Sequence, residues 1–268
     1  AAKRAGVPIV IHEQNARPGL ANKVGARNAA VVALTFPSSP LQARNGQTIV
    51  TGLPLRAAIA ELASRRADAQ GAAQARREAA ERLDVNPDAP TLLVTGGSLG
   101  ALHVNESMTG AADALPEGAQ VVHLTGRGKD EPVRAAVEKA GMSDRWHVID
   151  YLTTMEDALA VADLVVCRSG AGTVAEMEAL GLPCIYVPLP IGNGEQRLNA
   201  ADHVAAGGAQ LIDDKDFTAD FVRRNVFPLL GSTRLADMAA ASQSLGRAGA
   251  ARALADLALE QVKEAGNE

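Results

Sequence analysis

The sequence of 268 residues is long enough for one large domain or two modest domains with buried cores. Apolar residues make up 47% and charged residues 21%, ordinary globular values that argue against a disordered chain. The aromatic share is only 3%, while Ala and Gly are abundant, which favours helices packed closely on a parallel sheet. We expect neither a membrane-spanning segment nor a signal peptide.

The formal net charge of −5 is unevenly distributed along the chain. Residues 1–56 contain a single acid, Glu13, but seven basic residues: Lys3, Arg4, Arg17, Lys23, Arg27, Arg44 and Arg56. A basic portion joined to an acidic body predicts anionic ligands or an anionic membrane surface at one end. Ordinary solvated charges are the alternative interpretation.

The first part of the chain has the pattern of an αβ domain. Residues 7–11 form an apolar run typical of a strand, and residues 12–15 (HEQN) place polar groups at its carboxyl end, where open α/β sheets bind ligands. A helix over residues 18–27 and strands over 31–36 and 48–51 follow. Because residues 1–6 resemble the end of a helix, we interpret residues 1–55 as the closing remnant of a domain whose opening strands precede this sequence.

Residues 56–83 are rich in Ala, Arg and Glu and predict a helical connector, interrupted near Gly71, within a linker over 56–89. The next domain, 90–232, alternates strands with helices and therefore predicts a doubly wound parallel sheet. Its expected strands are 91–95, 120–125, 146–151, 163–167, 184–188 and 210–212. Beyond Phe217 the pattern is helical, and an amphipathic segment over 248–262, within the carboxyl-terminal helices 233–268, could pack on either domain.

Two cysteines, Cys167 and Cys184, fall in predicted buried strands without the spacing of metal ligands. This indicates small core residues in a reduced, cytosolic protein.

Residues 163–188 combine a strand, a small-residue turn, a helix and a second strand. Gly170 and Gly172 bracket the turn, and free backbone N–H groups at the following helix start suit a phosphate. Thr173 and Glu176 have the spacing of a capping box, in which Glu176 bonds the helix start. The alternative is that Glu176 accepts hydrogen bonds from two ribose hydroxyls.

Two further loops follow predicted strands. Residues 96–100 (GGSLG) form a second phosphate-type turn in which Ser98 can donate to a phosphate oxygen, but they lack the G-x-G-x-x-G dinucleotide pattern. After the fifth strand, Gln196 and Asn199 suit sugar hydroxyls, although Asn193 could simply cap a helix. Because backbone N–H groups and a helix end can stabilise a diphosphate, no metal is expected. Together the three loops predict a nucleotide-sugar site.

The sequence resembles the MurG family of bacterial peptidoglycan N-acetylglucosaminyltransferases over nearly its whole length. The matching segments, in order, are residues 12–15 (HEQN), 18–23 (PGLANK), 52–56 (GLPLR), 96–101 (GGSLGA) with Asn105, 166–173 (VCRSGAGT) with Glu176, and 192–200 (GNGEQRLNA). The resemblance implies a GT-B fold, in which two Rossmann-like domains face a cleft. It implies that the second domain binds UDP-GlcNAc and the first a lipid-linked acceptor.

The resemblance also implies residue roles. Glu176 would hold the ribose, while the main chain near Leu152 and the side of Arg56 would frame the uracil. Ser98 and Thr173 would face the diphosphate, and Gln196, Asn199 and the 12–15 loop with Asn15 would surround the GlcNAc. Members of the family commonly have Gln where this chain has Glu195, which leaves the role of Glu195 open.

The implied reaction is an inverting, metal-independent transfer of GlcNAc to the C4 hydroxyl of undecaprenyl-pyrophosphoryl-MurNAc-pentapeptide, without a cofactor, at the cytoplasmic side of the bacterial plasma membrane. A general base would activate the hydroxyl. His12 is a weak candidate for this base. The family's amino-terminal glycine-rich loop, with the His proposed to act there, has no counterpart here. It is therefore open whether this chain alone is active. Nucleic acid is not an expected partner. The alternatives are a UDP-sugar-binding module that needs a separate acceptor subunit, and a sugar-nucleotide epimerase.

Overall fold

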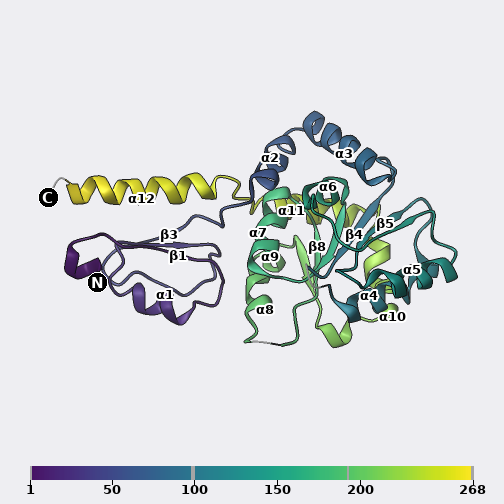
Figure 1. The fold of residues 1–268 in the computed structure, drawn as a ribbon, viewed down its shortest axis with the longest axis horizontal. Coiled ribbons are helices and arrows are strands. Elements are labelled where there is room, and N and C mark those ends of the chain that lie inside the picture. The colour runs from purple at the N-terminus through teal and green to yellow at the C-terminus, as the bar shows by residue number, and fades with distance from the viewer. Residues whose placement is uncertain (1, 98–99, 192, 267–268) are drawn as a thin grey trace.

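The computed structural model describes residues 2–97, 100–191 and 193–266, which form two parallel sheets (Figure 1). The small sheet has the strand order β1-β2-β3, with α1 connecting β1 to β2. Its elements are β1 (Val10–Glu13), α1 (Leu20–Gly25), β2 (Val31–Leu34) and β3 (Gln47–Val50), after a short 3-10 helix at Ala2–Ala5. The first strand begins later than predicted: Val7 is 54% exposed, and Pro8 has no N–H to donate to a neighbouring strand.

Two helices, α2 (Ala57–Arg65) and α3 (Ala69–Leu83), connect the sheets. The predicted interruption of the connector near Gly71 falls at residues 66–68, between the two helices, and Gly71 itself lies in the first turn of α3. Asp68 caps α3 by accepting a hydrogen bond from the Gly71 N–H at 2.8 Å. A Cβ at Gly71 would lie 2.3 Å from the Arg65 carbonyl oxygen, so the glycine permits close approach of the two helices.

The large sheet has the order β6-β5-β4-β7-β8-β9 with every pair parallel, which confirms the doubly wound α/β prediction. Chain order reverses between β4 and β7, the topological switch point where such sheets bind ligands. Its strands are β4 (Thr91–Thr95), β5 (Gln120–Leu124), β6 (Trp146–Ile149), β7 (Leu164–Cys167), β8 (Cys184–Tyr186) and β9 (Ala209–Leu211). Its helices are α4 (Leu102–Thr109), α5 (Asp130–Lys139), α6 (Met155–Val161), α7 (Ala171–Leu180), α8 (Glu195–Asn199) and α9 (Ala201–Ala205), with 3-10 turns at Ala112–Ala114 and Asp214–Asp216.

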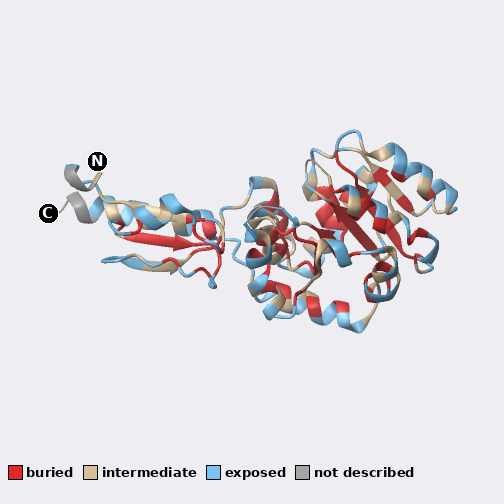
Figure 2. Ribbon diagram, turned by 90° about the horizontal axis from the view of Figure 1, so that it is seen from below, coloured by how far each residue is buried: buried red, intermediate tan, exposed pale blue. Residues whose placement is uncertain are grey.

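The large sheet is buried on both faces, which explains its continuous apolar strands (Figure 2). Leu93 and Val165 face a cluster that includes residues of α2, α3, α6 and α7, whereas Leu92 faces one that includes α4, α5 and α11. Cys167 and Cys184 are buried and free, as predicted for small core residues.

Beside the second cluster, at the start of β6, the indole N–H of Trp146 donates to His123 Nδ1 at 3.2 Å. His123 Nε2 therefore carries the proton that bonds Asn105 Oδ1 at 3.1 Å. Burial lowers the pKa of His123 to about 3, so the imidazole stays neutral.

After residue 217 the chain is helical, as predicted. The elements are α10 (Ala219–Phe221), a π-helical turn at Val222–Val226, a 3-10 turn at Phe227–Leu229, α11 (Thr233–Gln243) and α12 (Ala250–Gly266). In α11, Leu235 and Met238 join the core of the large sheet. By contrast, α12 extends beside the small sheet in both ribbon views (Figures 1 and 2). Within the described residues, no helix is long and apolar enough to cross a membrane.

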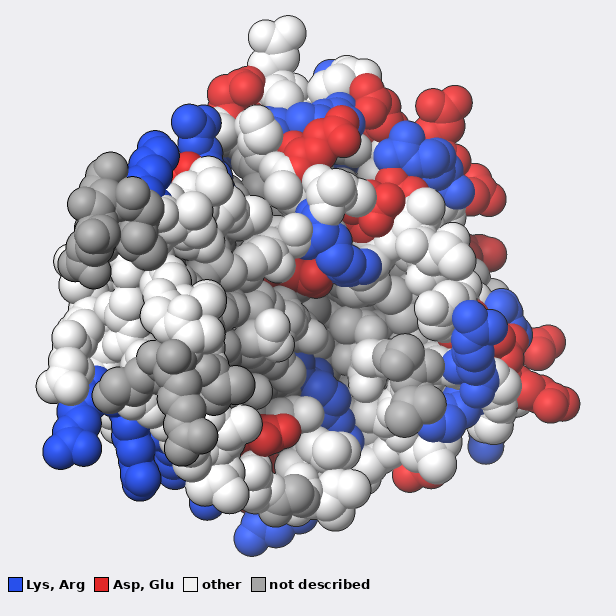
Figure 3. Space-filling view, turned by 60° about the vertical axis from the view of Figure 1, so that its left-hand side comes forward, with Lys and Arg blue, Asp and Glu red and all other residues white. Residues whose placement is uncertain are grey.

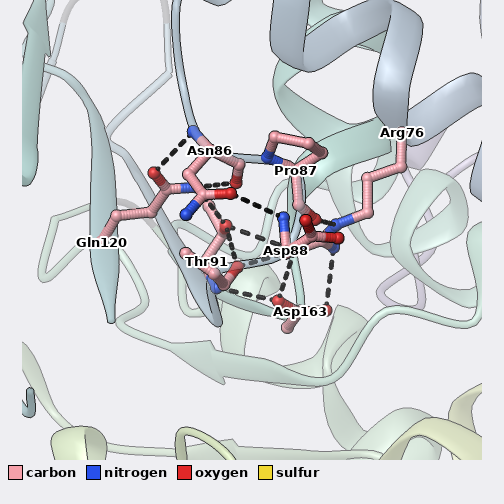
Figure 4. Close-up of polar contacts among 8 residues, drawn as sticks. Arg76, Asn86, Pro87, Asp88, Thr91, Gln120 and Asp163 are labelled. Atoms are coloured by element: carbon pink, nitrogen blue, oxygen red, sulfur yellow. Dashed lines mark hydrogen bonds and ion pairs between the residues drawn. The ribbon is translucent and has the colours of Figure 1, made fainter. Parts of the chain in front are cut away.

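A polar network connects helix α3 to the amino-terminal ends of strands in the large sheet (Figure 4). The Arg76 guanidinium donates to both oxygens of Asp163 at 2.9 Å, and also to the carbonyl oxygens of Pro87 and Ala89. Asp163 in turn accepts from the Thr91 N–H at 2.8 Å. This network lies at the end of the strands opposite to their carboxyl ends.

Candidate functional site

A cavity of about 230 Å³ opens at the carboxyl ends of β4 to β7, on both sides of the switch point. Of the residues proposed from the sequence, Arg56, Leu152, Thr173 and Glu176 line it together. The other lining residues are Thr95, Gly97, Leu124, Gly126, Asp150, Tyr151, Met155, Val165, Cys167, Arg168 and Met177. The structure therefore brings residues from four strand ends and the connector into one site.

The glycine-rich loop after β4 requires glycine at both of its ends. A Cβ at Gly96 would lie 2.2 Å from the Ala101 nitrogen. Gly100 has φ +67°, and a Cβ there would lie 2.1 Å from the Thr125 carbonyl oxygen. The loop thus runs against the β5 exit, with Gly97 at the cavity. Ser98, proposed from the sequence as a phosphate ligand, lies outside the described residues.

The turn after β7 begins α7 at Ala171, with Gly170 as an extended N-cap and no capping side chain. The capping-box interpretation of Thr173 and Glu176 was therefore wrong, since Thr173 lies inside the helix. The first N–H groups of α7 have no partner within the helix, and they carry its positive dipole end. This end adjoins the cavity wall formed by Arg168 and Thr173.

Glu176 is held by Arg56, which lies 120 residues earlier and just before α2. Arg56 donates from Nε and Nη2 to the two carboxylate oxygens, at 2.9 and 3.1 Å. These hydrogen bonds raise the pKa of the Arg56 guanidinium above its ordinary value. The Glu176 side chain is only 16% exposed, so a carboxylate with fixed orientation faces the cavity.

The wall formed by β5 and β6 is partly apolar, with Leu124, Leu152 and Met155. Two further wall residues, Asp150 and Tyr151, were absent from the residues proposed from the sequence. The Arg127 guanidinium stacks 3.7 Å from the centre of the Tyr151 ring. Their position directly after β6 was the available signal, because ligands of such sheets gather at the carboxyl ends of strands.

Asn15 and Asn199 meet between the two sheets. Asn199 is 1% exposed, and its Nδ2 donates to Asn15 Oδ1 at 3.2 Å and to the Ser169 carbonyl oxygen at 3.4 Å. Its Oδ1 accepts from the Ala16 N–H at 2.9 Å. Gln196 lies outside the cavity lining and accepts a hydrogen bond from the Leu189 N–H at 2.9 Å.

The 12–15 loop has its own internal supports. His12 Nε2 lies 2.9 Å from the Gly52 carbonyl oxygen, which only accepts, so Nε2 carries the proton in this contact. Glu13 is 3% exposed and accepts from the N–H groups of Asn15 and Gly19 and from Asn22 Nδ2. Glu13 therefore fixes the loop that carries Asn15.

Among the described residues, no group of three or more His, Cys, Asp or Glu side chains is arranged to hold a metal ion. The charged groups that line the cavity are Arg56, Arg168, Asp150 and Glu176. Arg168 pairs with Asp214, which offsets its charge. The site can therefore offer an anionic group backbone N–H donors, and it can offer a diol the Glu176 carboxylate.

Comparisons with known proteins agree with this architecture. Residues 91–255 match the glycosyltransferase family 28 C-terminal domain, and residues 1–34 match the glycosyltransferase family 28 N-terminal domain. The chain is 47% identical over 270 residues to a Bifidobacterium longum protein, covering 95% of this chain and 68% of the relative. That relative is named UDP-N-acetylglucosamine-N-acetylmuramyl-(pentapeptide) pyrophosphoryl-undecaprenol N-acetylglucosamine transferase.

Solved structures give the same result for the fold. The crystal structure of MurG from Acinetobacter baumannii superposes with a TM-score of 0.76 at 26% identity, covering 97% of this chain and 68% of that one. A UDP-N-acetylglucosamine 2-epimerase structure from Listeria monocytogenes gives a TM-score of 0.63 at 19% identity, covering 94% and 67%. The second likeness concerns the fold alone. The architecture is that of GT-B glycosyltransferases.

Proposed function

The chain belongs to the MurG family of bacterial N-acetylglucosaminyltransferases, and on that basis we propose that it transfers GlcNAc from UDP-GlcNAc to a lipid-linked MurNAc-pentapeptide. The product of this transfer is lipid II, a precursor of peptidoglycan. The observation that carries the proposal is the convergence of Arg56, Leu152, Thr173 and Glu176 on one cavity at the switch point of the large sheet.

In the proposed complex the uridine occupies this cavity. Glu176 accepts hydrogen bonds from both ribose hydroxyls, since its two oxygens already bind paired donors from Arg56. The Leu152 main chain and the side of Arg56 flank the uracil. The diphosphate lies between the glycine-rich loop, which includes Ser98, and the α7 start at Thr173, where N–H groups and the helix dipole stabilise negative charge.

The proposed reaction is an inverting displacement. The C4 hydroxyl oxygen of the acceptor forms a bond to the anomeric carbon while the bond from that carbon to the diphosphate oxygen breaks. UDP leaves with the bonding electrons, and backbone N–H groups stabilise its developing charge without a metal ion. The hydroxyl proton passes to a general base, which we leave unassigned; His12 Nε2 donates to the Gly52 carbonyl oxygen, so only Nδ1 of that ring could accept a proton. Asn15 and Gln196 are proposed to contact the GlcNAc.

The test uses UDP-[¹⁴C]GlcNAc and a lipid I analogue, with and without each substrate. We expect labelled disaccharide lipid only when both are present, with one UDP released per transfer. Binding of UDP without transfer would instead support a donor-binding module. Release of UDP with an altered free sugar in the absence of acceptor would support an epimerase, and either result would contradict the proposal.

We also propose that the small-sheet end of the chain docks on an anionic membrane surface, on the cytoplasmic side, where the lipid-linked acceptor is held. Leu20 and Val24 lie one helical turn apart on α1 and are 78% and 53% exposed, beside the exposed Lys23. Figure 3, which brings this end forward, shows Lys and Arg along its lower left edge and acids mainly across the top and right. An apolar ridge with basic neighbours fits a membrane interface.

A further inference from the structure

We propose that Asn199 is a positioning residue, which holds the loop of Asn15 against the turn after β7 so that the Asn15 amide meets the transferred sugar. This inference deepens the proposed function and depends on it. The starting observation is that Asn199, the last residue of α8, is 1% exposed. A side chain so deeply buried has no surface of its own to offer a sugar.

The orientation of the Asn199 amide is fixed by its partners. The Ala16 N–H can only donate, so the Asn199 oxygen faces it. The Nδ2 group is thereby directed at two acceptors, Asn15 Oδ1 and the Ser169 carbonyl oxygen. Reversing the amide would bring donor against donor and acceptor against acceptor.

These contacts join segments far apart in the chain. Asn15 and Ala16 follow β1 of the small sheet, and Ser169 directly precedes the Gly170 N-cap of α7 in the large sheet. The positions joined are separated by 184 and 30 residues from Asn199. One amide therefore sets the spacing between the proposed phosphate turn after β7 and the loop after β1.

The bond from Asn199 also determines what Asn15 presents. Asn15 Oδ1 is occupied by Asn199, while Asn15 Nδ2 has no hydrogen bond to any residue that the structure describes. Asn15 is half-buried, and Glu13 fixes its backbone N–H. Two oriented N–H donors are consequently left for an acceptor such as a hydroxyl or an acetamido oxygen of the sugar.

The experiment compares UDP with UDP-GlcNAc by titration calorimetry for the wild-type chain, N199A, N15D and the double variant N15D/N199A. Asp at position 15 still accepts from Asn199 but loses the N–H donors. We expect N199A and N15D each to lower the affinity for UDP-GlcNAc about tenfold, which is the effect of losing one or two hydrogen bonds. The affinity for UDP should stay unchanged. The double variant should lose no more than either single variant, because both act on one interaction.

Three results would overturn the inference. They are an equal loss of affinity for UDP and for UDP-GlcNAc in N199A, additive losses of UDP-GlcNAc affinity in the double variant, or full UDP-GlcNAc affinity in N15D. The first indicates a merely structural amide, and the second a direct sugar contact by Asn199. If N199A does not fold, N199D decides, because Asp at this position keeps the acceptor for the Ala16 N–H and loses only the donor to Asn15 and Ser169. A wild-type chain that fails to bind UDP refutes the proposed function, whereas one that binds UDP and UDP-GlcNAc equally refutes only the inference.

Discussion

Arg56 and Glu176 form a two-point ion pair that links the connector between the sheets to the helix following β7. Because the ribose hydroxyls are proposed to bind the same carboxylate oxygens, the nucleotide replaces the guanidinium as the partner of Glu176. The Arg56 side chain is 56% exposed, so solvent screens its end of the pair, and an exchange that leaves the Glu176 carboxylate hydrogen-bonded to the ribose costs little.

Glu176→Gln tests the ribose contact. The substitution replaces an anionic acceptor of two hydroxyls by an amide with one acceptor oxygen, so we expect UDP affinity to fall roughly 10- to 100-fold. Calorimetry with UDP and with 2′,3′-dideoxy-UDP provides the measurement. The dideoxy ligand should bind both proteins equally, and Glu138→Gln, on the exposed face of α5, should bind UDP normally. Equal losses for both ligands would show that Glu176 acts elsewhere.

Leu20→Ser with Val24→Ser tests the membrane surface. We expect binding to vesicles of phosphatidylglycerol and phosphatidylcholine to weaken about tenfold or more, because two exposed apolar side chains no longer enter the interface. Flotation of the vesicles at low and high salt measures this binding, and high salt should also weaken vesicle binding by the wild-type chain. Leu259→Ser, on α12 and 58% exposed, is the matched control. A larger loss of vesicle binding in the Leu259→Ser control would show that α12, and not α1, contacts the membrane.

Arg76→Met separates stability from binding. The change leaves Asp163 without its guanidinium and two carbonyl oxygens without a donor, so we expect the free energy of unfolding to fall by about 2 kcal/mol or more. UDP affinity should stay constant because the network lies at the opposite strand ends. Urea unfolding and calorimetry supply the two values. Arg77→Met, at an exposed neighbour that donates to Gln74, should change neither quantity.

Glu178 predicts a pH dependence of stability. Burial raises its pKa to about 7, helped by Asp202 and opposed by Arg247, and Glu178 Oε1 has no hydrogen-bond partner. A raised carboxyl pKa stabilises the fold below about pH 4.5, and this contribution is lost as the pH rises through 7. At pH 8 we therefore expect Glu178→Gln to have a free energy of unfolding in urea about 1 to 3 kcal/mol higher than that of the wild type. At pH 4.5 the two proteins should have the same free energy of unfolding. Equal differences at both pH values would contradict a titrating Glu178.

Gly208→Ala tests a buried polar chain next to β9. Tyr186 OH contacts His203 Nδ1 at 2.9 Å, and His203 Nε2 contacts Ser242 Oγ at 2.7 Å. A Cβ at Gly208 would lie 2.5 Å from both His203 Nε2 and Ser242 Oγ, so we expect a loss of about 1 to 3 kcal/mol. Thermal and urea unfolding measure the loss. Gly249→Ala, where no atom lies within 4 Å of the new Cβ, should be neutral.

The strands and the two turns of the large sheet could be predicted because they depend on local pattern. Buried strands such as β4 and β7 are continuous apolar runs, and the glycines around Gly96 and Gly170 mark tight exits. The interruption of the connector was expected near Gly71 because glycine is conspicuous in a sequence, whereas its exact position at residues 66–68 depends on one hydrogen bond from the Gly71 N–H to the Asp68 side chain.

The site was predictable in part. Thr173 and Glu176 follow the turn after a predicted strand and could be located from the sequence, whereas Leu152 and Arg56 were added by resemblance. The contacts of Asn199 with Asn15 and Ala16, and the bond from Arg56 to Glu176, join positions more than 100 residues apart, which no periodicity reports. The same limitation applies to Asn199 itself, because a short polar side chain after a glycine-rich loop has the same pattern whether it is exposed or buried.

The chain contains a single tryptophan, and Trp146 lies 2% exposed at the start of β6, while the cavity opens at the carboxyl ends of the strands. Its neighbour His123 remains neutral in the folded state over the usual pH range. Tryptophan emission of this molecule should consequently follow denaturation of the sheet and remain silent to nucleotide occupancy, so titrations by tryptophan emission require a labelled ligand or an introduced fluorophore.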